Sequence, residues 1–180
     1  MILTGRCEET PSGWTRPAVP RQGADSLGWE DHTQRRETAV SVLLNPYLSF
    51  PDAQAREALE FYQSVLGGQL DVMTFGDVGT DGPIADQVMH GQLTTPGGIT
   101  LMGADAPPDV VQVTYGDNVS VSLSGGPEDA ELLRGWFAAL SDGGEVRQPL
   151  EAAPWGDEFG MFVDRFGIAW MVNIAGAAAS

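Results

Sequence analysis

The chain has 180 residues and a formal net charge of −16, because 25 acidic residues outnumber nine basic residues, all of them arginine. This length predicts one domain with at most a tail, and the charge argues against nucleic acid as a partner, since phosphate binding requires basic patches. The single cysteine, Cys7, excludes an intrachain disulfide and a multi-cysteine metal site, and the absence of an apolar run of roughly 18 residues or of a signal-peptide core predicts a cytoplasmic protein without membrane contact.

Residues 1–40 are rich in proline, glycine and polar side chains, and no helical or strand period persists in them. This composition predicts a disordered N-terminal extension. From residue 41 onward the chain has four arginines and nineteen acidic residues, a net charge of 4 − 19 = −15. The acidity is interpreted first as a source of solubility. Tolerance of high salt and steering of a cationic ligand are the alternatives.

Residues 41–104 are predicted to form a first β-α-β-β-β module. The expected strands cover residues 41–50, 69–75, 86–95 and 98–103. A helix is expected to begin with Asp52 as its N-cap and to end at Gly67-Gly68, where glycine supplies a left-handed cap. The apolar positions of this helix recur at helical spacing and should face the core. They are Ala55, Ala58, Leu59, Tyr62 and Leu66.

After a linker over residues 104–116, the pattern restarts in a second module, residues 117–175, followed by a tail, residues 176–180. Its strands are expected over residues 117–124, 145–150, 159–163 and 168–174. Pro127 suits the first turn of a helix that ends at Gly143-Gly144. The inward positions of that helix are Leu133, Trp136, Phe137 and Leu140. Asp164 and Gly167 bound a tight turn between the last two strands.

The two modules form an internal repeat with an offset of 76 residues. Phe61 corresponds to Phe137, and Gly67-Gly68 corresponds to Gly143-Gly144. A single unit of this kind cannot cover its own sheet, so the two units should pair. The predicted fold is α+β, with two βαβββ modules forming a curved mixed sheet. One face of the sheet would carry the helices and the other would enclose a cleft.

Several short motifs carry a resemblance to a known family. They are Asn45-Pro46-Tyr47-Leu48, Ala58-Leu59-Glu60-Phe61-Tyr62, Met89-His90-Gly91-Gln92-Leu93, Pro154-Trp155-Gly156-Asp157 and the run from Asp164 to Trp170. Over residues 41–175 the chain resembles the vicinal oxygen chelate superfamily, in its PhnB-like, glyoxalase/bleomycin-resistance-like branch. The resemblance implies paired modules, a homodimer and a cup-shaped site.

In metal-using members of the superfamily, the resemblance implies four histidine, glutamine or glutamate ligands that project into the cup. The corresponding places here are near Asn45, Met102, Asn118 or Ser120, and Met171. None of these residues is histidine, glutamate or aspartate, and the two modules contain only one histidine, His90. Amides and thioethers are poor ligands for Zn²⁺ or Mg²⁺. We therefore expect no cofactor and no catalytic metal.

The pocket is expected to be lined by one face of several strands. Its candidate residues are Tyr47, Ser49, His90, Gln92, Met102, Ser120, Ser122, Trp155, Phe162, Met171 and Asn173. His90 is the one catalytic candidate, as a general base or a ligand hydrogen-bonder, because histidine titrates near neutral pH. A hydrogen-bonded structural histidine is the alternative. Trp155 could stack on a flat ligand or anchor the core.

Three functions are consistent with these residues. The first is a protein that binds a small organic molecule in the cup without a metal. The second is an enzyme of the superfamily, a lyase, isomerase or oxygenase, that uses His90. The third is a regulatory domain that binds a partner protein. The fold alone cannot name the ligand, because one fold hosts many chemistries.

Overall fold

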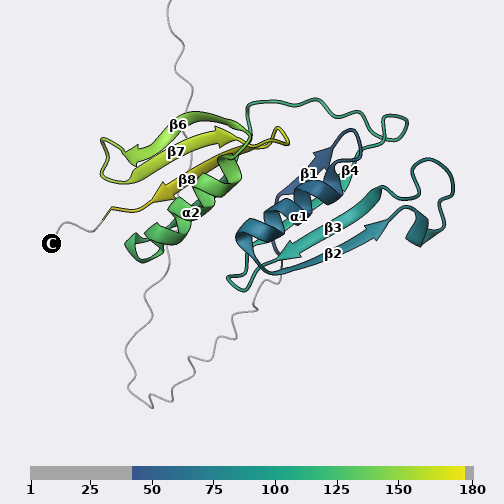
Figure 1. Cartoon of the computed structure of the whole chain (residues 1–180), viewed down its shortest axis with the longest axis horizontal. Coiled ribbons are helices and arrows are strands. Elements are labelled where there is room, and N and C mark those ends of the chain that lie inside the picture. The colour runs from purple at the N-terminus through teal and green to yellow at the C-terminus, as the bar shows by residue number, and fades with distance from the viewer. Residues whose placement is uncertain (1–41, 177–180) are drawn as a thin grey trace, which may run out of the picture. The chain divides into compact units, whose positions relative to one another are not determined.

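The computed structural model describes residues 42–176, so the extension expected over residues 1–40 and the last four residues lie outside the described part. The strands and α-helices follow the order β-α-β-β-β twice (Figure 1). Module one contains β1 (Tyr47–Phe50), α1 (Ala55–Leu66), β2 (Gln69–Thr74), β3 (Val88–Thr94) and β4 (Thr100–Asp105). Module two contains β5 (Val121–Gly125), α2 (Ala130–Ser141), β6 (Glu145–Ala152), β7 (Glu158–Val163) and β8 (Ala169–Ile174). The predicted fold class is thus confirmed.

The strands form two mixed sheets of four strands each. Sheet A has the order β1-β4-β3-β2, and sheet B has the equivalent order β5-β8-β7-β6. In each sheet the first strand of the module runs parallel to the last, and the other neighbours are antiparallel. Within residues 42–176 no strand of sheet A pairs with a strand of sheet B, whereas the sequence predicted one curved sheet.

Each helix packs on one face of its own sheet, and the apolar spacing explains which side it buries. The stripe predicted for α1 is confirmed, since its five residues are the buried residues of that helix. In α2, Leu133 and Leu140 are buried, and Trp136 and Phe137 pack against the core from partly exposed positions. Residues from both modules contribute to one hydrophobic core.

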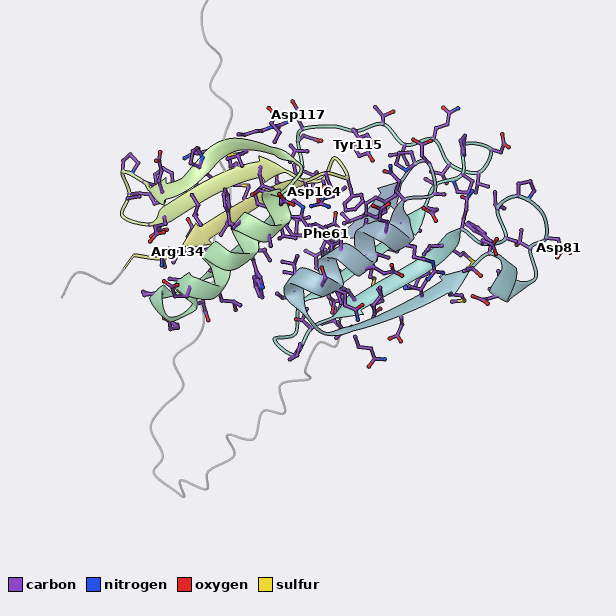
Figure 2. The ribbon with its side chains drawn as sticks, in the orientation of Figure 1. Phe61, Asp81, Tyr115, Asp117, Arg134 and Asp164 are labelled. Carbon is purple, nitrogen blue, oxygen red and sulfur yellow. The ribbon has the colours of Figure 1, made fainter. Side chains whose placement is uncertain are left out.

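The turn between β7 and β8 links module two to α1 of module one (Figure 2). The buried Asp164 carboxylate in this turn accepts a hydrogen bond from the Tyr62 hydroxyl of α1 at 2.6 Å. Phe166, in the same turn, contacts the rings of Phe50, Phe61 and Tyr62. Aromatic packing and one buried polar contact therefore hold the two modules together.

The start of α1 differs from the prediction that Asp52 is the N-cap. The helix begins at Ala55, and both Asp52 and Ala53 have left-handed backbone conformations, with φ of 60° and 59°. The buried Asp105 carboxylate of β4 satisfies the first helical N–H instead, because its Oδ1 accepts from Ala55 N at 2.8 Å. Its Oδ2 accepts from Val88 N at 2.7 Å. Asp105, which is 50 positions away from Ala55, thus takes the capping role that the sequence had assigned to Asp52.

Replacement of Ala53 by glycine should stabilise the protein by about 0.5–1 kcal/mol, because a left-handed conformation costs an alanine about 1–2 kcal/mol and the extra chain entropy of glycine offsets part of the gain. Ala53 is exposed, so the change removes no core contact. Urea denaturation would measure the difference. Ala130, at the start of α2 with φ of −56°, is the control, since glycine there should destabilise the protein. Destabilisation by Ala53→Gly would contradict the argument.

The first strand of module two is shorter than predicted. β5 begins at Val121, so Asn118 and Ser120 precede the strand rather than lie on it. Val119 is 75% exposed and does not pack beneath a helix.

No α-helix within residues 42–176 has the length and apolar character needed to cross a membrane.

Candidate functional site

Sheet A has one face covered by α1 and one face that α1 does not cover, which we call the open face of sheet A. Strand alternation assigns side chains to it. Those on the open face include Tyr47, Ser49, Met73, His90, Gln92 and Met102. They are half-buried or exposed, whereas their helix-side neighbours Leu48, Phe50, Leu93 and Leu101 are buried. The five candidates that the sequence placed on β1, β3 and β4 therefore share one face.

Tyr47 and His90 are in direct contact on this face. The Tyr47 hydroxyl lies 3.2 Å from His90 Nδ1, and the two ring centroids are 5.7 Å apart. Partial burial raises the pKa of the Tyr47 hydroxyl, so Tyr47 remains a proton donor at neutral pH. When Nδ1 accepts that proton, His90 carries its own hydrogen on Nε2, where it can be donated to a ligand.

The strand register places polar and soft apolar groups around this pair. Met102 pairs with Tyr47 on one side and with Gln92 on the other, and Met73 pairs with His90. The Gln92 amide nitrogen donates to Thr94 Oγ1 at 3.2 Å, and the carbonyl oxygen of the same side chain is an acceptor. The face thus offers an aromatic ring, hydrogen-bonding groups and two adaptable thioethers.

A register irregularity between Met73 and Thr74 changes one predicted alternation. Strict alternation along the strand would place Val88 on the same face as His90, but Val88 pairs with Thr74 and is completely buried. The shift leaves Met89 outside the pairing, so Val88 and His90 point to opposite faces. Met73 was missed as a candidate, although its alternation with Leu70 and Val72 could have identified it.

Sheet B has its own face away from α2, formed by β5, β6, β7 and β8. Ser122 and Met161 both pair with Met171 across this face. Asn173 lies beside them, but its Nδ2 donates to Asp157 Oδ2 at 3.0 Å, so the amide is already engaged. Trp155 is 62% exposed, and its ring contacts that of Phe159 at 5.7 Å between centroids.

Phe162 is a correction to the predicted pocket. Its side chain is 1% exposed, and its ring packs edge-on against Phe137 of α2 and stacks with Trp170. It therefore belongs to the core. The predicted site residues that lie on strands, apart from Phe162, fall on two faces, one on each sheet, and among residues 42–176 no hydrogen bond or aromatic contact joins those faces. Ser120 lies before β5, outside both strand arrays.

The donor groups at the implied metal positions do not suit a divalent metal. Asn45, Met102, Ser120 and Met171 offer amide, thioether and hydroxyl groups, without an imidazole or a carboxylate. Residues 42–176 contain no group of three or more histidine, cysteine, aspartate or glutamate side chains arranged to hold a metal ion. We therefore assign no chemical step to a metal.

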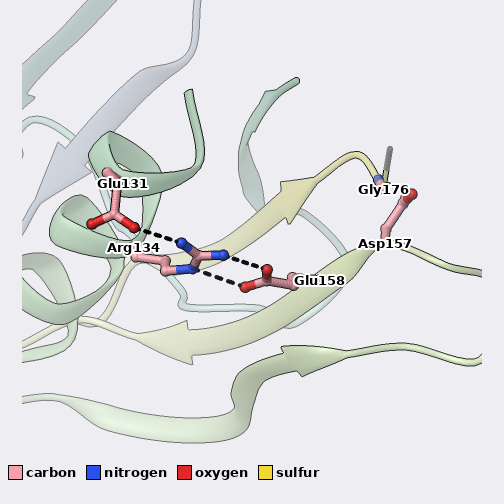
Figure 3. A network of polar contacts seen from close by, with 5 residues as sticks. All are labelled: Glu131, Arg134, Asp157, Glu158 and Gly176. Carbon is pink, nitrogen blue, oxygen red and sulfur yellow. Dashed lines mark hydrogen bonds and ion pairs between the residues drawn. The ribbon is translucent and has the colours of Figure 1, made fainter. Parts of the chain in front are cut away.

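A second candidate is a hollow of about 440 Å³ between the start of α2, the start of β7 and the end of β8. Arg134 lines this hollow and forms ion pairs with Glu131 and Glu158 (Figure 3). Hydrogen bonds from Arg134 lower the pKa of Glu158, and the Gly176 N–H, with Asn173, lowers the pKa of Asp157. Because each of these charged groups already has a partner, the hollow offers less free binding capacity than the open face of sheet A.

Comparisons with known proteins bear on the same region. The family model of the Glyoxalase/Bleomycin resistance protein/Dioxygenase superfamily matches residues 45–172. The solved structure of protein PA1353 from Pseudomonas aeruginosa is 36% identical with a TM-score of 0.67, and the match covers 76% of this chain and all of that chain. A PhnB protein from Bacillus cereus is 25% identical with a TM-score of 0.58, covering 73% of this chain and 98% of that one. Protein YjdN of Escherichia coli (strain K12) is 26% identical over 73% of this chain and 94% of its own length.

Proposed function

Because the chain belongs to the Glyoxalase/Bleomycin resistance protein/Dioxygenase superfamily, we propose that it binds a small organic molecule on the open face of sheet A, without a catalytic metal. The Tyr47–His90 contact is the observation that carries this proposal. It joins an aromatic surface to a hydrogen-bonding group at one place, and no helix covers it. We further propose that the protein acts in the cytoplasm.

The chemistry of the face favours a flat, partly apolar ligand. Tyr47 is 50% exposed, so one side of its ring is available for stacking. Met102, on β4 between the strands of Tyr47 and His90, and Met73, next to His90 on β2, can adapt to an irregular ligand. His90 and Gln92 supply the few directional polar groups that fix orientation in small-molecule sites.

We propose that a second copy of the chain encloses the site. β1 and β5 are edge strands, and their outer sides are available for pairing with another chain. Exposed apolar side chains lie just before both strands: Leu43 and Leu44 before β1, and Val119 before β5. A homodimer that covers these edges would bury them and would close the open face into a cup.

An enzyme is the second candidate, and the same contact favours it. If His90 Nδ1 instead donates to the Tyr47 oxygen, Nε2 carries no hydrogen and can accept a proton from a ligand, which is the geometry of a general base. A lyase, isomerase or oxygenase would require His90 to act on the bound molecule. Consumption of a bound compound by the wild type, but not by His90→Ala, would favour this alternative.

Native mass spectrometry of the full chain with tryptophol, a neutral indole alcohol, tests the binding proposal. We expect a dimer that holds the probe, and the Tyr47→Ala variant should bind it about tenfold more weakly because the stacking surface is lost. His90→Ala should weaken binding in the same direction. Gln112→Ala, in the exposed linker, is the control and should bind like the wild type. Equal binding by the Tyr47→Ala and wild-type proteins would contradict the proposed site.

A further inference from the structure

The open face of sheet A carries negative charge and no positive charge from its own strands. β1, β2, β3 and β4 contain neither arginine nor lysine. Asp71, an exposed residue of β2 that pairs with Gln92, is the one acidic or basic side chain, apart from His90, that these strands place on this face. Asp105, on β4, faces the other way and is occupied by the backbone N–H groups of Ala55 and Val88.

The part of the chain that contains sheet A also has a net negative charge. Residues 42–120 contain one arginine, Arg56, and ten aspartate or glutamate residues, a net charge of 1 − 10 = −9. Hydrogen bonds from Thr74 lower the pKa of Asp77, and the charge of Arg56, on α1, acts in the same direction. In module two, Arg134 and Arg165 are paired with carboxylates, and the third arginine, Arg147, belongs to β6 of sheet B.

The usual backbone site for an anion is also unavailable in this module. The N-terminus of a helix attracts anions through its free N–H groups and its dipole. At α1 that position is taken by the Asp105 carboxylate, with Oδ1 2.8 Å from Ala55 N. An anionic ligand on the open face would therefore meet only neutral donors within a negative field.

We propose that the ligand of the open face of sheet A is a cation, of the aromatic amine class, rather than a carboxylate or a phosphonate. This inference rests on the proposed function, since it concerns the same site. The exposed ring of Tyr47 can stack on the aromatic part, and its face can also stabilise a positive charge. Asp71 lies on the same face, opposite Gln92 and two residues along β2 from Met73, the partner of His90. The negative field of the module attracts such a ligand from solution.

Three probes that share an indole ring and a two-carbon chain separate charge from shape. Tryptamine ends in an ammonium group, tryptophol in a hydroxyl and indole-3-propionate in a carboxylate. Titration calorimetry of the full chain at low salt should show tryptamine binding about tenfold more tightly than tryptophol, and indole-3-propionate binding most weakly. High salt should shrink these differences, because exposed charges are screened beyond a distance of about 10 Å at 0.1 M salt.

The Asp71→Asn variant tests the residue directly. It should weaken tryptamine binding about threefold, the size expected for one exposed charge pair, and leave tryptophol binding unchanged. Asp81→Asn makes the same charge change on the loop between β2 and β3 and is the matched control (Figure 2). Tyr47→Ala should weaken the binding of every probe that the wild type binds, because all three probes share the indole ring.

The outcomes separate this inference from the proposal beneath it. Binding of tryptophol that depends on Tyr47, with no advantage for tryptamine or with tighter binding of indole-3-propionate, would overturn the charge preference alone. Equal losses of tryptamine binding in Asp71→Asn and Asp81→Asn would remove Asp71 from the site. Failure of all three probes to bind the wild type would overturn both proposals.

Discussion

Replacement of Asp164 by asparagine is expected to lower the free energy of unfolding by about 3 kcal/mol, because it leaves a buried donor without a partner. Asp164 is 3% exposed. Its Oδ1 accepts from the backbone N–H groups of Phe166 and Ile168, at 2.9 and 3.0 Å. Its Oδ2 accepts from the Tyr62 hydroxyl and from Trp170 Nε1, at 2.6 and 2.8 Å. Four donors thus converge on one carboxylate.

The asparagine side chain cannot satisfy the same four donors. If its oxygen faces the two backbone N–H groups, its amide nitrogen faces Tyr62 and Trp170. The Tyr62 hydroxyl can rotate and accept, but the Trp170 indole can only donate. Burial and the adjacent Asp164 charge raise the pKa of Tyr62 far above its ordinary value, so Tyr62 serves as a donor in the wild-type protein.

Urea denaturation, monitored by tryptophan fluorescence and by circular dichroism, would measure the loss of stability. The control is Asp142→Asn, which removes an exposed carboxylate that pairs with Arg165 and should have little effect. Tyr62→Phe should cost about 1–3 kcal/mol, since Asp164 loses one of its four donors. An Asp164→Asn protein as stable as the Asp142→Asn protein would show that the four hydrogen bonds to Asp164 contribute little to joining the modules.

The sequence predicted the features that depend on local spacing. The buried stripe of α1 recurs at helical intervals, so its five members could be identified without knowledge of their partners. The turn from Asp164 to Gly167 was also identifiable from its residues, and the structure shows the Gly167 N–H donating to the Asp164 carbonyl at 3.0 Å. The role of the Asp164 side chain was not identifiable, because two of its donors, Tyr62 and Trp170, are fixed by tertiary packing.

The site was predicted less completely, for reasons that concern strand geometry. Phe162 was placed in the pocket because β7 is apolar on both faces, with Phe159 and Met161 alternating with it. Alternation cannot choose a face in such a strand. Strict alternation would also put Val88 on the face of His90, because the register irregularity between Met73 and Thr74 has no signature in the residues. The Tyr47–His90 contact depends on β1 lying parallel to β4, with β3 next to it, which sequence periodicity does not encode.

Replacement of Gly68 by alanine should have the other large effect on stability, about 3 kcal/mol or more. Gly68 connects α1 to β2 and has φ of +98°. A methyl group there would overlap the carbonyl oxygen of Thr94 and lie 2.8 Å from the Cα of Thr95. Both obstacles are backbone at the end of β3, so the clash cannot be relieved by a change of side-chain rotamer.

Two other glycines separate the two causes of this cost. Gly67 has φ of +72° and ψ of −171° but no neighbouring atom within 4 Å, so Gly67→Ala should cost only the conformational strain, about 1–3 kcal/mol. Gly144 is the repeat equivalent of Gly68 and lacks the positive φ, but its methyl group would overlap the Val163 carbonyl oxygen. The loss of stability in Gly144→Ala should therefore reflect the clash alone. The loss in Gly68→Ala should be larger than the loss in Gly67→Ala or in Gly144→Ala. A Gly68→Ala protein no less stable than Gly67→Ala would contradict the steric argument.

The clash at Gly144 also predicts a link between the two predictions. A methyl group at position 144 would lie 2.9 Å from the Cα of Asp164, the residue that collects the four donors. Displacement of that backbone would disturb the hydrogen bonds to Tyr62 and Trp170 before Asp164 itself is changed. The Gly144→Ala and Asp164→Asn effects should therefore sum to more than the loss in the double variant, by about 1 kcal/mol, because contacting residues couple. Gly68→Ala, whose neighbours are Thr94 and Thr95 in module one, should instead add to Asp164→Asn without coupling.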